Sequence, residues 1–177
     1  MKHGLQRIAI SGKSGCGNTT VSRLIADELG LRFINFTFRS LAAERGITLQ
    51  EVLRLAAEDD WWDKEVDGRQ VALAREDGGC VLGSRLAVWM LPEADLKVYL
   101  RAADDERARR IVKREGGDFA EVEAFTRERD RQDHDRYLRI YGIDNEDLSG
   151  VDLVVDTDGM APADIAGLII GRLRGDA

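Results

Sequence analysis

The sequence predicts an α/β fold in which helices cover both faces of a mostly parallel, five-stranded sheet. Three observations lead to this prediction. Five short apolar runs have the length of buried strands. Patterns with helical spacing separate these runs, and strands that alternate with helices form parallel sheets. The 177 residues contain no linker and no internal repeat, so we expect one domain over residues 1–177.

The chain opens with a strand, a turn, a helix and a second strand. Residues 8–10 and 32–36 are the apolar runs expected to form the two strands. Between them, apolar side chains recur at helical spacing over residues 21–29, and Gly30 supplies a helix end.

Residues 37–79 contain no further strand pattern and read as a wholly helical segment. Residues 38–45 form the first expected helix, and Gly46 ends it. The next helix runs to residue 57 and begins at Thr48, with Glu51 three residues later as in a capping box. The third helix spans residues 61–75 and carries two adjacent tryptophans, Trp61 and Trp62, which suit a core or a ligand cleft equally well. A helical insertion between two strands is typical of a segment that covers a ligand.

The second half of the chain returns to alternating strands and helices. Strands are expected at residues 80–83, 96–100 and 151–156. Helices are expected at residues 104–115, 119–141 and 162–174, where a glycine pair ends the first and Pro162 begins the last.

A glycine-rich turn follows the first strand and precedes the first helix, which is the context of a phosphate-binding loop. Its glycines let successive backbone N–H groups and the helix N-terminus point at an anion. Its spacing fits the usual pattern, except that Asn18 stands where that pattern has Lys. A merely flexible turn is the alternative. The candidate phosphate-binding loop comprises Gly12, Lys13, Ser14, Gly15, Cys16, Gly17, Asn18, Thr19 and Thr20.

Composition narrows the class of ligand. The net charge of −7 argues against a general nucleic-acid surface, and no apolar run has the length of a membrane span. Two cysteines, Cys16 and Cys80, make no disulfide framework, which suits a reducing cytoplasm. Of the 26 basic residues 21 are arginines, and ten of these lie between residues 101 and 139. Arginine grips phosphate oxygens in two places, so small phosphorylated ligands are expected; a solvated helix of alternating charge is the alternative.

Two arginines follow strands at the edge where ligands bind in open α/β sheets. Arg39 comes shortly after the second strand, and Arg85 follows Gly83 and Ser84 after the third. Both are candidates to hold a second phosphate near the phosphate-binding loop. Taken singly, each fits an ordinary surface residue better.

The helix at residues 119–141 carries Arg129, Asp133 and Arg136 at spacings that place all three on one face. Such a face can meet a phosphorylated ligand. On spacing alone, the slightly favoured interpretation is an intrahelical ladder of ion pairs, which contributes only a few tenths of a kcal/mol.

These motifs together resemble the nucleoside monophosphate kinases, and most closely the short cytidylate kinases of archaea and spirochaetes. The resemblance implies a P-loop NTPase fold, with residues 37–79 as the acceptor-binding insertion and residues 104–141 as an arginine-rich lid. It implies that Arg39 and Arg85 hold the acceptor phosphate. It also implies that Arg129, Asp133 and Arg136 meet the acceptor's sugar and the transferring phosphates. The segments that carry it are 10–20, 38–39, 81–87, 114–117 and 141–144.

The reaction implied is transfer of the γ-phosphoryl group of ATP to CMP or dCMP, with Thr19 as a ligand of Mg²⁺. We expect a monomeric, cytoplasmic enzyme without nucleic-acid or membrane partners. Two departures from the wider family bear on this implied reaction. Asn18 stands where the loop usually has Lys, and Gly83 stands where other cytidylate kinases have Asp. A kinase of another small acceptor and a sensor that binds nucleotide without catalysis remain as alternatives.

Since Asn18 offers only neutral donors, other groups must supply positive charge to the phosphates. Lys13 is expected to point outward, which leaves the arginines of the lid as the better candidates. In the protein without ligand, we expect the arginines of the insertion and the lid to face one another unpaired.

Overall fold

The computed structural model describes residues 6–175 and contains a five-stranded, all-parallel sheet in the order β2-β3-β1-β4-β5. Register pairs Ile10 of the central strand with Gly83 on one side and with Val98 on the other. Because all strands are parallel, their carboxyl ends meet at one edge of the sheet, where ligands bind in such folds. The strands are β1 (Arg7–Gly12), β2 (Arg32–Ile34), β3 (Cys80–Gly83), β4 (Leu96–Arg101) and β5 (Leu153–Asp156).

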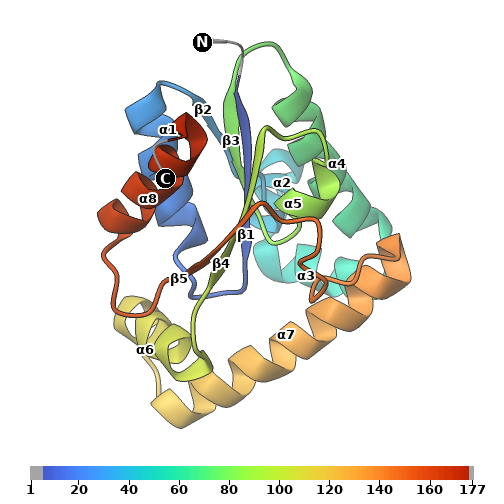
Figure 1. Cartoon of the computed structure of the whole chain (residues 1–177). Helices are drawn as coiled ribbons and strands as arrows, with labels where there is room; N and C mark the ends of the chain where they lie inside the picture. Colours follow the sequence, from blue (N-terminus) through green and yellow to red (C-terminus); the bar gives the residue numbers. More distant parts are fainter. Residues whose placement is uncertain (1–5, 176–177) are drawn as a thin grey trace.

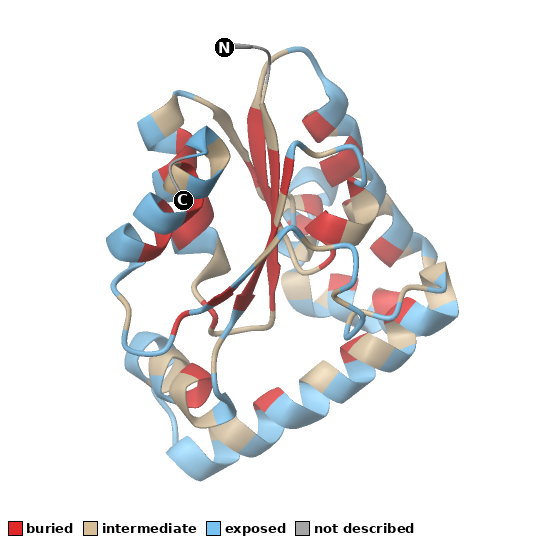
Figure 2. Ribbon diagram, viewed as in Figure 1, coloured by how far each residue is buried: buried red, intermediate tan, exposed pale blue. Residues whose placement is uncertain are grey.

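Helices cover both faces of the sheet (Figure 1). On one face, α1 (Asn18–Leu29) and α8 (Pro162–Arg174) pack on a core that includes Ile10 and Val98. On the other face, α4 (Trp61–Arg75) and α5 (Ala87–Met90) pack on a second core around Leu82. Figure 2 shows the strands as the buried centre of the molecule and the outer faces of the helices as exposed. None of the helices within residues 6–175 is both long and apolar enough to span a membrane.

Two groups of helices flank the edge formed by the carboxyl ends of the strands. The insertion consists of α2 (Phe38–Arg45), α3 (Leu49–Glu58) and α4. The second group lies between β4 and β5 in the chain and consists of α6 (Asp104–Glu115) and α7 (Phe119–Tyr141). Both helices lie below the strand ends, and α7 runs from α6 toward the insertion (Figure 1). The insertion and α7 therefore enclose the edge at which the phosphate-binding loop lies.

Local signals define most of these elements as expected. Thr48 caps α3 by accepting the N–H of Glu51 at 3.1 Å, but Glu51 turns its carboxylate to Arg54 and does not complete the capping box. A complete capping box occurs instead at Thr37 and Ser40, which begin α2.

The fold class, the five strands and the seven expected helices are confirmed, with small differences at the boundaries. β2 ends at Ile34, two residues before the expected end, and β5 begins at Leu153, two residues after the expected start. The short helix α5 was not expected. Its four residues are too few to show a helical period, and packing of Ala87 and Val88 in the second core stabilises it.

Candidate active site

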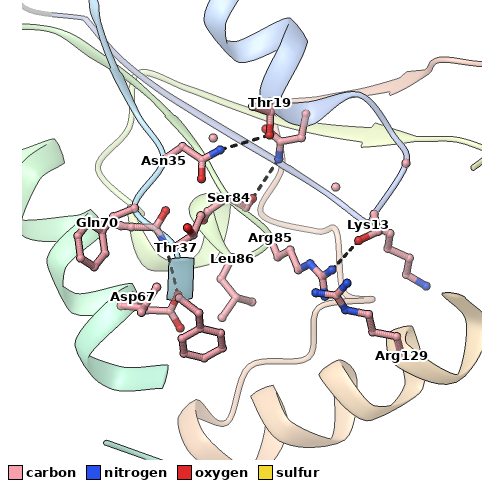
Figure 3. Close-up of a pocket in the computed structure, with 18 of the residues that line it drawn as sticks. Lys13, Thr19, Asn35, Thr37, Asp67, Gln70, Ser84, Arg85, Leu86 and Arg129 are labelled. Carbon is pink, nitrogen blue, oxygen red and sulfur yellow. Dashed lines mark hydrogen bonds between the residues drawn. The ribbon is translucent and has the colours of Figure 1, made fainter. Parts of the chain in front are cut away.

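A cleft of about 380 Å³ lies at the carboxyl edge of the sheet, between the phosphate-binding loop, the insertion and α7 (Figure 3). Eight of the nine residues of the loop line it; Cys16 does not. The other lining residues are Asn35, Phe36, Thr37, Phe38, Asp63, Val66, Asp67, Gln70, Gly83, Ser84, Arg85, Leu86, Arg114, Arg129, Arg136 and Tyr137.

The phosphate-binding loop has the backbone that its glycines predict. Gly15 and Gly17 have φ values of 86° and 88°, in the left-handed region that favours glycine. A Cβ on Gly15 would also lie 2.8 Å from the carbonyl oxygen of Arg107, so no side chain fits there. Gly17 is the N-cap of α1 and provides no side-chain cap, which leaves N–H groups of the first turn available to an anion.

Two arginines of α6 brace the loop from outside. Arg107, which is only 1% exposed, donates to the carbonyl of Ser14 at 3.1 Å and pairs with Asp130 on α7 at 2.6 Å. Arg110 donates to the carbonyls of Gly15 at 3.3 Å and Thr157 at 2.7 Å. These contacts hold loop carbonyls away from the cleft. The three-residue spacing of Arg107 and Arg110 signals one helix face, but it does not reveal that this face contacts the loop.

Asn18 does not point its amide at a ligand. Its Nδ2 donates to the carbonyls of Ile10 at 2.9 Å and Ser84 at 3.2 Å, and its Oδ1 accepts from Ser22 at 2.9 Å. Both amide hydrogens are thereby used on main-chain oxygens of β1 and of the turn after β3. Only the backbone N–H of Asn18 remains for a phosphate.

Lys13 and Cys16 turn their side chains away from the cleft. The ammonium group of Lys13 lies 3.9 Å from a carboxylate oxygen of Glu146, and Figure 3 shows the side chain leading away from Thr19. The expectation that Lys13 points outward is confirmed. The thiol of Cys16 is buried in the core, and burial raises its pKa, so this cysteine contributes to the loop only through its backbone.

Arg85 and Arg129 bring two guanidinium groups together beside the loop (Figure 3). Arg85 donates to the hydroxyl of Ser14 at 2.5 Å. Burial of its side chain and the positive charge of Arg129 lower the pKa of Arg85 to about 10. Within residues 6–175, Arg129 has no carboxylate within ion-pair distance. Like charges held this close favour an anion between them.

The acidic member of the motif on α7 joins two arginines. Asp133 is buried and forms an ion pair with Arg85 and another with Arg136, the latter at 2.9 Å. Arg136 also pairs with the buried carboxylate of Asp63 on α4 at 3.2 Å. The ion pair between Asp133 and Arg136 is the i,i+3 pair expected for an intrahelical ladder. It belongs, however, to a network that links α7, α4 and the turn after β3. The expectation that arginines of the insertion and the lid are unpaired is wrong for Arg136, because the carboxylates of Asp63 and Asp133 neutralise it.

Three residues singled out in the sequence lie away from the cleft lining. Arg39 is exposed on α2 and is not among the lining residues, so its role as an acceptor ligand stays a prediction. Trp61 and Trp62 pack edge to face, 5.0 Å between ring centroids, with the guanidinium of Arg45 over Trp61. Neither tryptophan lines the cleft.

The wall of the cleft formed by α4 carries polar residues that sequence reasoning missed. Tyr141 donates its hydroxyl to Asp67 at 2.7 Å, and Gln70 donates to the same carboxylate at 3.4 Å. Burial raises the pKa of Asp67 to about 6. Polar side chains at i and i+3 in the helical insertion are the only signal, and many exposed helices share it.

Oxygen donors for a divalent cation gather at the start of α1. The hydroxyl of Thr19 accepts from Nδ2 of Asn35 at 3.2 Å, which leaves the carbonyl oxygen of Asn35 beside it. Within residues 6–175 no group of three acidic, histidine or cysteine side chains could hold a metal ion. One or two oxygen ligands are nevertheless what Mg²⁺ needs when phosphates and water complete its shell, so the donor set fits that ion.

Comparison with known proteins places the chain among nucleotide kinases. Residues 7–159 match the Cytidylate kinase-like family. Cytidylate kinase 2 of Borreliella burgdorferi is 47% identical over 167 residues, which cover 92% of each chain. Cytidylate kinase of Pyrococcus abyssi is 40% identical over 171 residues, covering 96% of this chain and 94% of that protein.

Solved structures support the fold independently. Shikimate kinase from Acinetobacter baumannii matches with a TM-score of 0.68 at 18% identity, covering 97% of this chain and 94% of that one. Deoxyadenosine kinase from M. mycoides matches with a TM-score of 0.60 at 16% identity, covering 96% and 100%. The expected P-loop kinase fold is thus confirmed. With the family match over most of its length and relatives above 40% identity, the chain belongs to the cytidylate kinase-like family.

Proposed function

We propose that this protein transfers the γ-phosphoryl group of ATP to CMP or dCMP, giving ADP and CDP or dCDP. The observation that carries the proposal is the pair Arg85 and Arg129, whose guanidinium groups meet beside the phosphate-binding loop. A loop that binds one phosphate chain next to a separate cationic site suits a donor and an acceptor that both carry phosphate.

On the donor side, the backbone of residues 12–20 holds the phosphates of ATP. Support comes from the left-handed glycines and the uncapped start of α1, which turn N–H groups outward. Since the amide of Asn18 is used on main-chain carbonyls, arginines supply the charge that a loop Lys would otherwise bring. Arg129 and Arg114, both on the cleft lining, are in position to do so.

On the acceptor side, Arg85 and Arg39 hold the phosphate of CMP, and Arg39 reaches it when the insertion closes. Asp133 orients Arg85 and Arg136, with which it forms ion pairs. It also accepts a hydrogen bond from a hydroxyl group of the acceptor's sugar. Arg129 and Arg136 stabilise the charge that develops on the transferring group.

Mg²⁺ accompanies ATP in this proposal, with the hydroxyl of Thr19 as its protein ligand and the side-chain oxygen of Asn35 nearby. When bound, the ion neutralises phosphate charge. Phosphates and water complete the remainder of the shell.

The chain's own contribution is alignment and exclusion of water. The acceptor phosphate is already anionic and needs no strong base, so catalysis rests on positioning and on charge. We propose that residues 37–79 and 104–141 close over the substrates and keep water from the phosphoryl group. One chain carries every proposed ligand, which supports a monomeric enzyme, and two buried free thiols suit a cytoplasmic setting.

A coupled assay of ADP formation with CMP, dCMP, UMP, AMP and GMP tests the proposal. We expect CMP or dCMP to give the highest kcat/KM. Preference for AMP or GMP by tenfold, about 1.4 kcal/mol, would contradict the cytidylate assignment and leave a kinase of another acceptor. Tight ATP binding without phosphoryl transfer to any acceptor would instead identify a sensor.

A further inference from the structure

The α4 wall of the cleft, opposite Arg85 and Arg129, presents hydrogen-bond acceptors. Asp67 and Gln70 extend from α4 into the cleft, while Arg85 and Arg129 lie on its other side (Figure 3). This arrangement places Asp67 and Gln70 away from Arg85 and Arg129, whereas Arg136 contacts the same wall through Asp63. The wall is therefore available to another part of a bound nucleotide.

The amide of Gln70 is held in one orientation. Its Nε2 donates to Oδ1 of Asp67 at 3.4 Å, and Oδ2 of that carboxylate accepts from the hydroxyl of Tyr141 at 2.7 Å. A carboxylate can only accept, so turning the amide over would place two oxygens against each other. Tyr141 thus positions Asp67, and Asp67 positions Gln70.

The free end of this amide is a buried acceptor. Gln70 is 4% exposed, and its Oε1 has no hydrogen-bond partner anywhere in residues 6–175. A buried carbonyl without a donor costs about 1–3 kcal/mol. Such a group in a ligand cleft indicates a place where the ligand supplies the donor.

We infer that Gln70 and Asp67 read the base of the acceptor nucleotide, by accepting hydrogen bonds from the exocyclic amino group of a cytosine ring. The inference rests on the proposed function, since it names the part of the same site that selects the substrate. Gln70 is a specificity-determining residue, and Asp67 both contacts the base and orients Gln70.

The chemistry of the base edge explains the selectivity. Cytosine carries an amino group with two N–H donors where uracil carries a carbonyl oxygen. Two N–H groups match Oε1 of Gln70 and the carboxylate of Asp67, whereas the oxygen of uracil would face two acceptors. A site built to receive a donor rejects the analogue that lacks it, because its own polar groups are then left unpaired.

Titration of Asp67 sets the pH range in which the carboxylate on the α4 wall accepts hydrogen bonds and donates none. Burial raises the pKa of Asp67 to about 6, the hydrogen bond from Tyr141 opposes that rise, and Asp63 and Arg136 are the other charged groups facing it. At neutral pH the carboxylate is ionised and accepts only. Below pH 6 it gains a proton and can donate to uracil.

Two near-isosteric variants test the inference. Gln70→Met keeps the length of the side chain and removes the acceptor, and Asp67→Asn keeps the shape and introduces a donor. Gln50→Met makes the same chemical change at an exposed position of α3, outside the cleft lining, and serves as the matched control. The readout is the ratio of kcat/KM for CMP to kcat/KM for UMP, which does not depend on the fraction of folded enzyme. Calorimetric binding of CMP and of UMP without ATP gives a second readout.

We expect the wild type and Gln50→Met to share a ratio that favours CMP. Gln70→Met should lower the ratio at least tenfold, mainly through CMP, and Asp67→Asn should lower it by weakening CMP and improving UMP. A wild-type ratio near one, or variants that keep the wild-type ratio within twofold, would overturn the inference. Absence of turnover together with selective CMP binding that Gln70→Met abolishes would overturn the proposed function and support the inference; binding of neither nucleotide overturns both.

Discussion

A Cβ on Gly83 would lie 3.0 Å from Oδ1 of Asn18, so the amide of Asn18 occupies space that any larger residue at position 83 would need. Ser22 closes the same space, with its Oγ 2.7 Å from that Cβ position. The two departures from the wider family, Asn18 in place of Lys and Gly83 in place of Asp, are therefore parts of the same packing arrangement. Asn18 connects β1 to the turn that carries Arg85, and Gly83 makes room for it.

Gly83→Ala tests this arrangement. The added methyl group must displace Asn18 or Ser22, and overpacking of a tight site costs about 1–3 kcal/mol. Urea unfolding should show a loss of stability in this range. In the double variant Gly83→Ala with Ser22→Ala, part of the loss should be recovered, because the shortest contact is removed. Additive effects of the two substitutions would show that the residues do not compete for space.

The source of positive charge for the phosphates can be tested with Lys13 and Arg129. Lys13 pairs loosely with Glu146 outside the cleft, so Lys13→Ala should change kcat by less than about fivefold. Arg129→Ala should lower kcat on the order of 10³-fold, as loss of an arginine that stabilises the transferring group does. Both constants are measured at saturating ATP and CMP. If Lys13→Ala had a strongly reduced kcat and Arg129→Ala had a nearly normal one, the positive charge on the phosphates would come from the loop instead.

Arg136 provides a separate test, because it has two buried carboxylate partners. Arg136→Ala should lower kcat on the order of 10³-fold and also destabilise the fold, since Asp63 and Asp133 lose a partner. Asp63→Asn relieves one of these carboxylates. If the role of Arg136 is only to neutralise them, the double variant with Asp63→Asn should regain stability and activity together. If Arg136 acts on the phosphates, stability returns and kcat does not.

Closure of the cleft predicts a change in hydrogen exchange. Residues 37–79 and 101–140 should exchange faster without ligand than with ATP and CMP together, because the phosphates draw the arginines of the two segments toward one site. The core strands β1 and β4 serve as an internal reference. Equal protection of both segments in the two conditions would contradict closure.

The pH dependence of stability should report Asp67. Its pKa in the folded protein is about 6, against 3.8 for the ordinary group, because burial disfavours the charged form. Between pH 4 and 6 the folded state therefore binds more protons than the unfolded state, and Asp67 lowers the free energy of unfolding as pH rises. Asp67→Asn removes this loss, so the stability of the variant relative to wild type should rise across that window by up to about 3 kcal/mol and stay constant above it. Denaturant titrations at several pH values measure the difference, and a pH-independent difference would contradict the raised pKa.

Most of the fold could be predicted because its signals are local. Five apolar runs, helix ends at Gly30 and Gly46 and the start of α8 at Pro162 are properties of a few neighbouring residues. The same holds for the phosphate-binding loop, in which Gly15 and Gly17 take left-handed conformations. The exception is α5, whose four residues become helical through packing.

The candidate site could be predicted only in part. Arg85, Arg129 and Arg136 do line one cleft, but their partners could not be foreseen from spacing along the chain. Asp63, which pairs with Arg136, lies 73 positions earlier in the sequence. Asp67 and Gln70 showed only an i,i+3 spacing of polar side chains, which many exposed helices share.

The sequence by itself thus determined the α/β fold, the position of the phosphate-binding loop and the arginine-rich character of the site. These follow from backbone conformation and apolar periodicity, which neighbouring residues specify. Only the tertiary structure decided that Asn18 faces the main chain and that Gln70, on the cleft lining, keeps a buried oxygen without a partner in residues 6–175. The direction and charge state of a polar side chain depend on which distant groups desolvate it and hydrogen-bond to it, and those groups come together only when the chain folds.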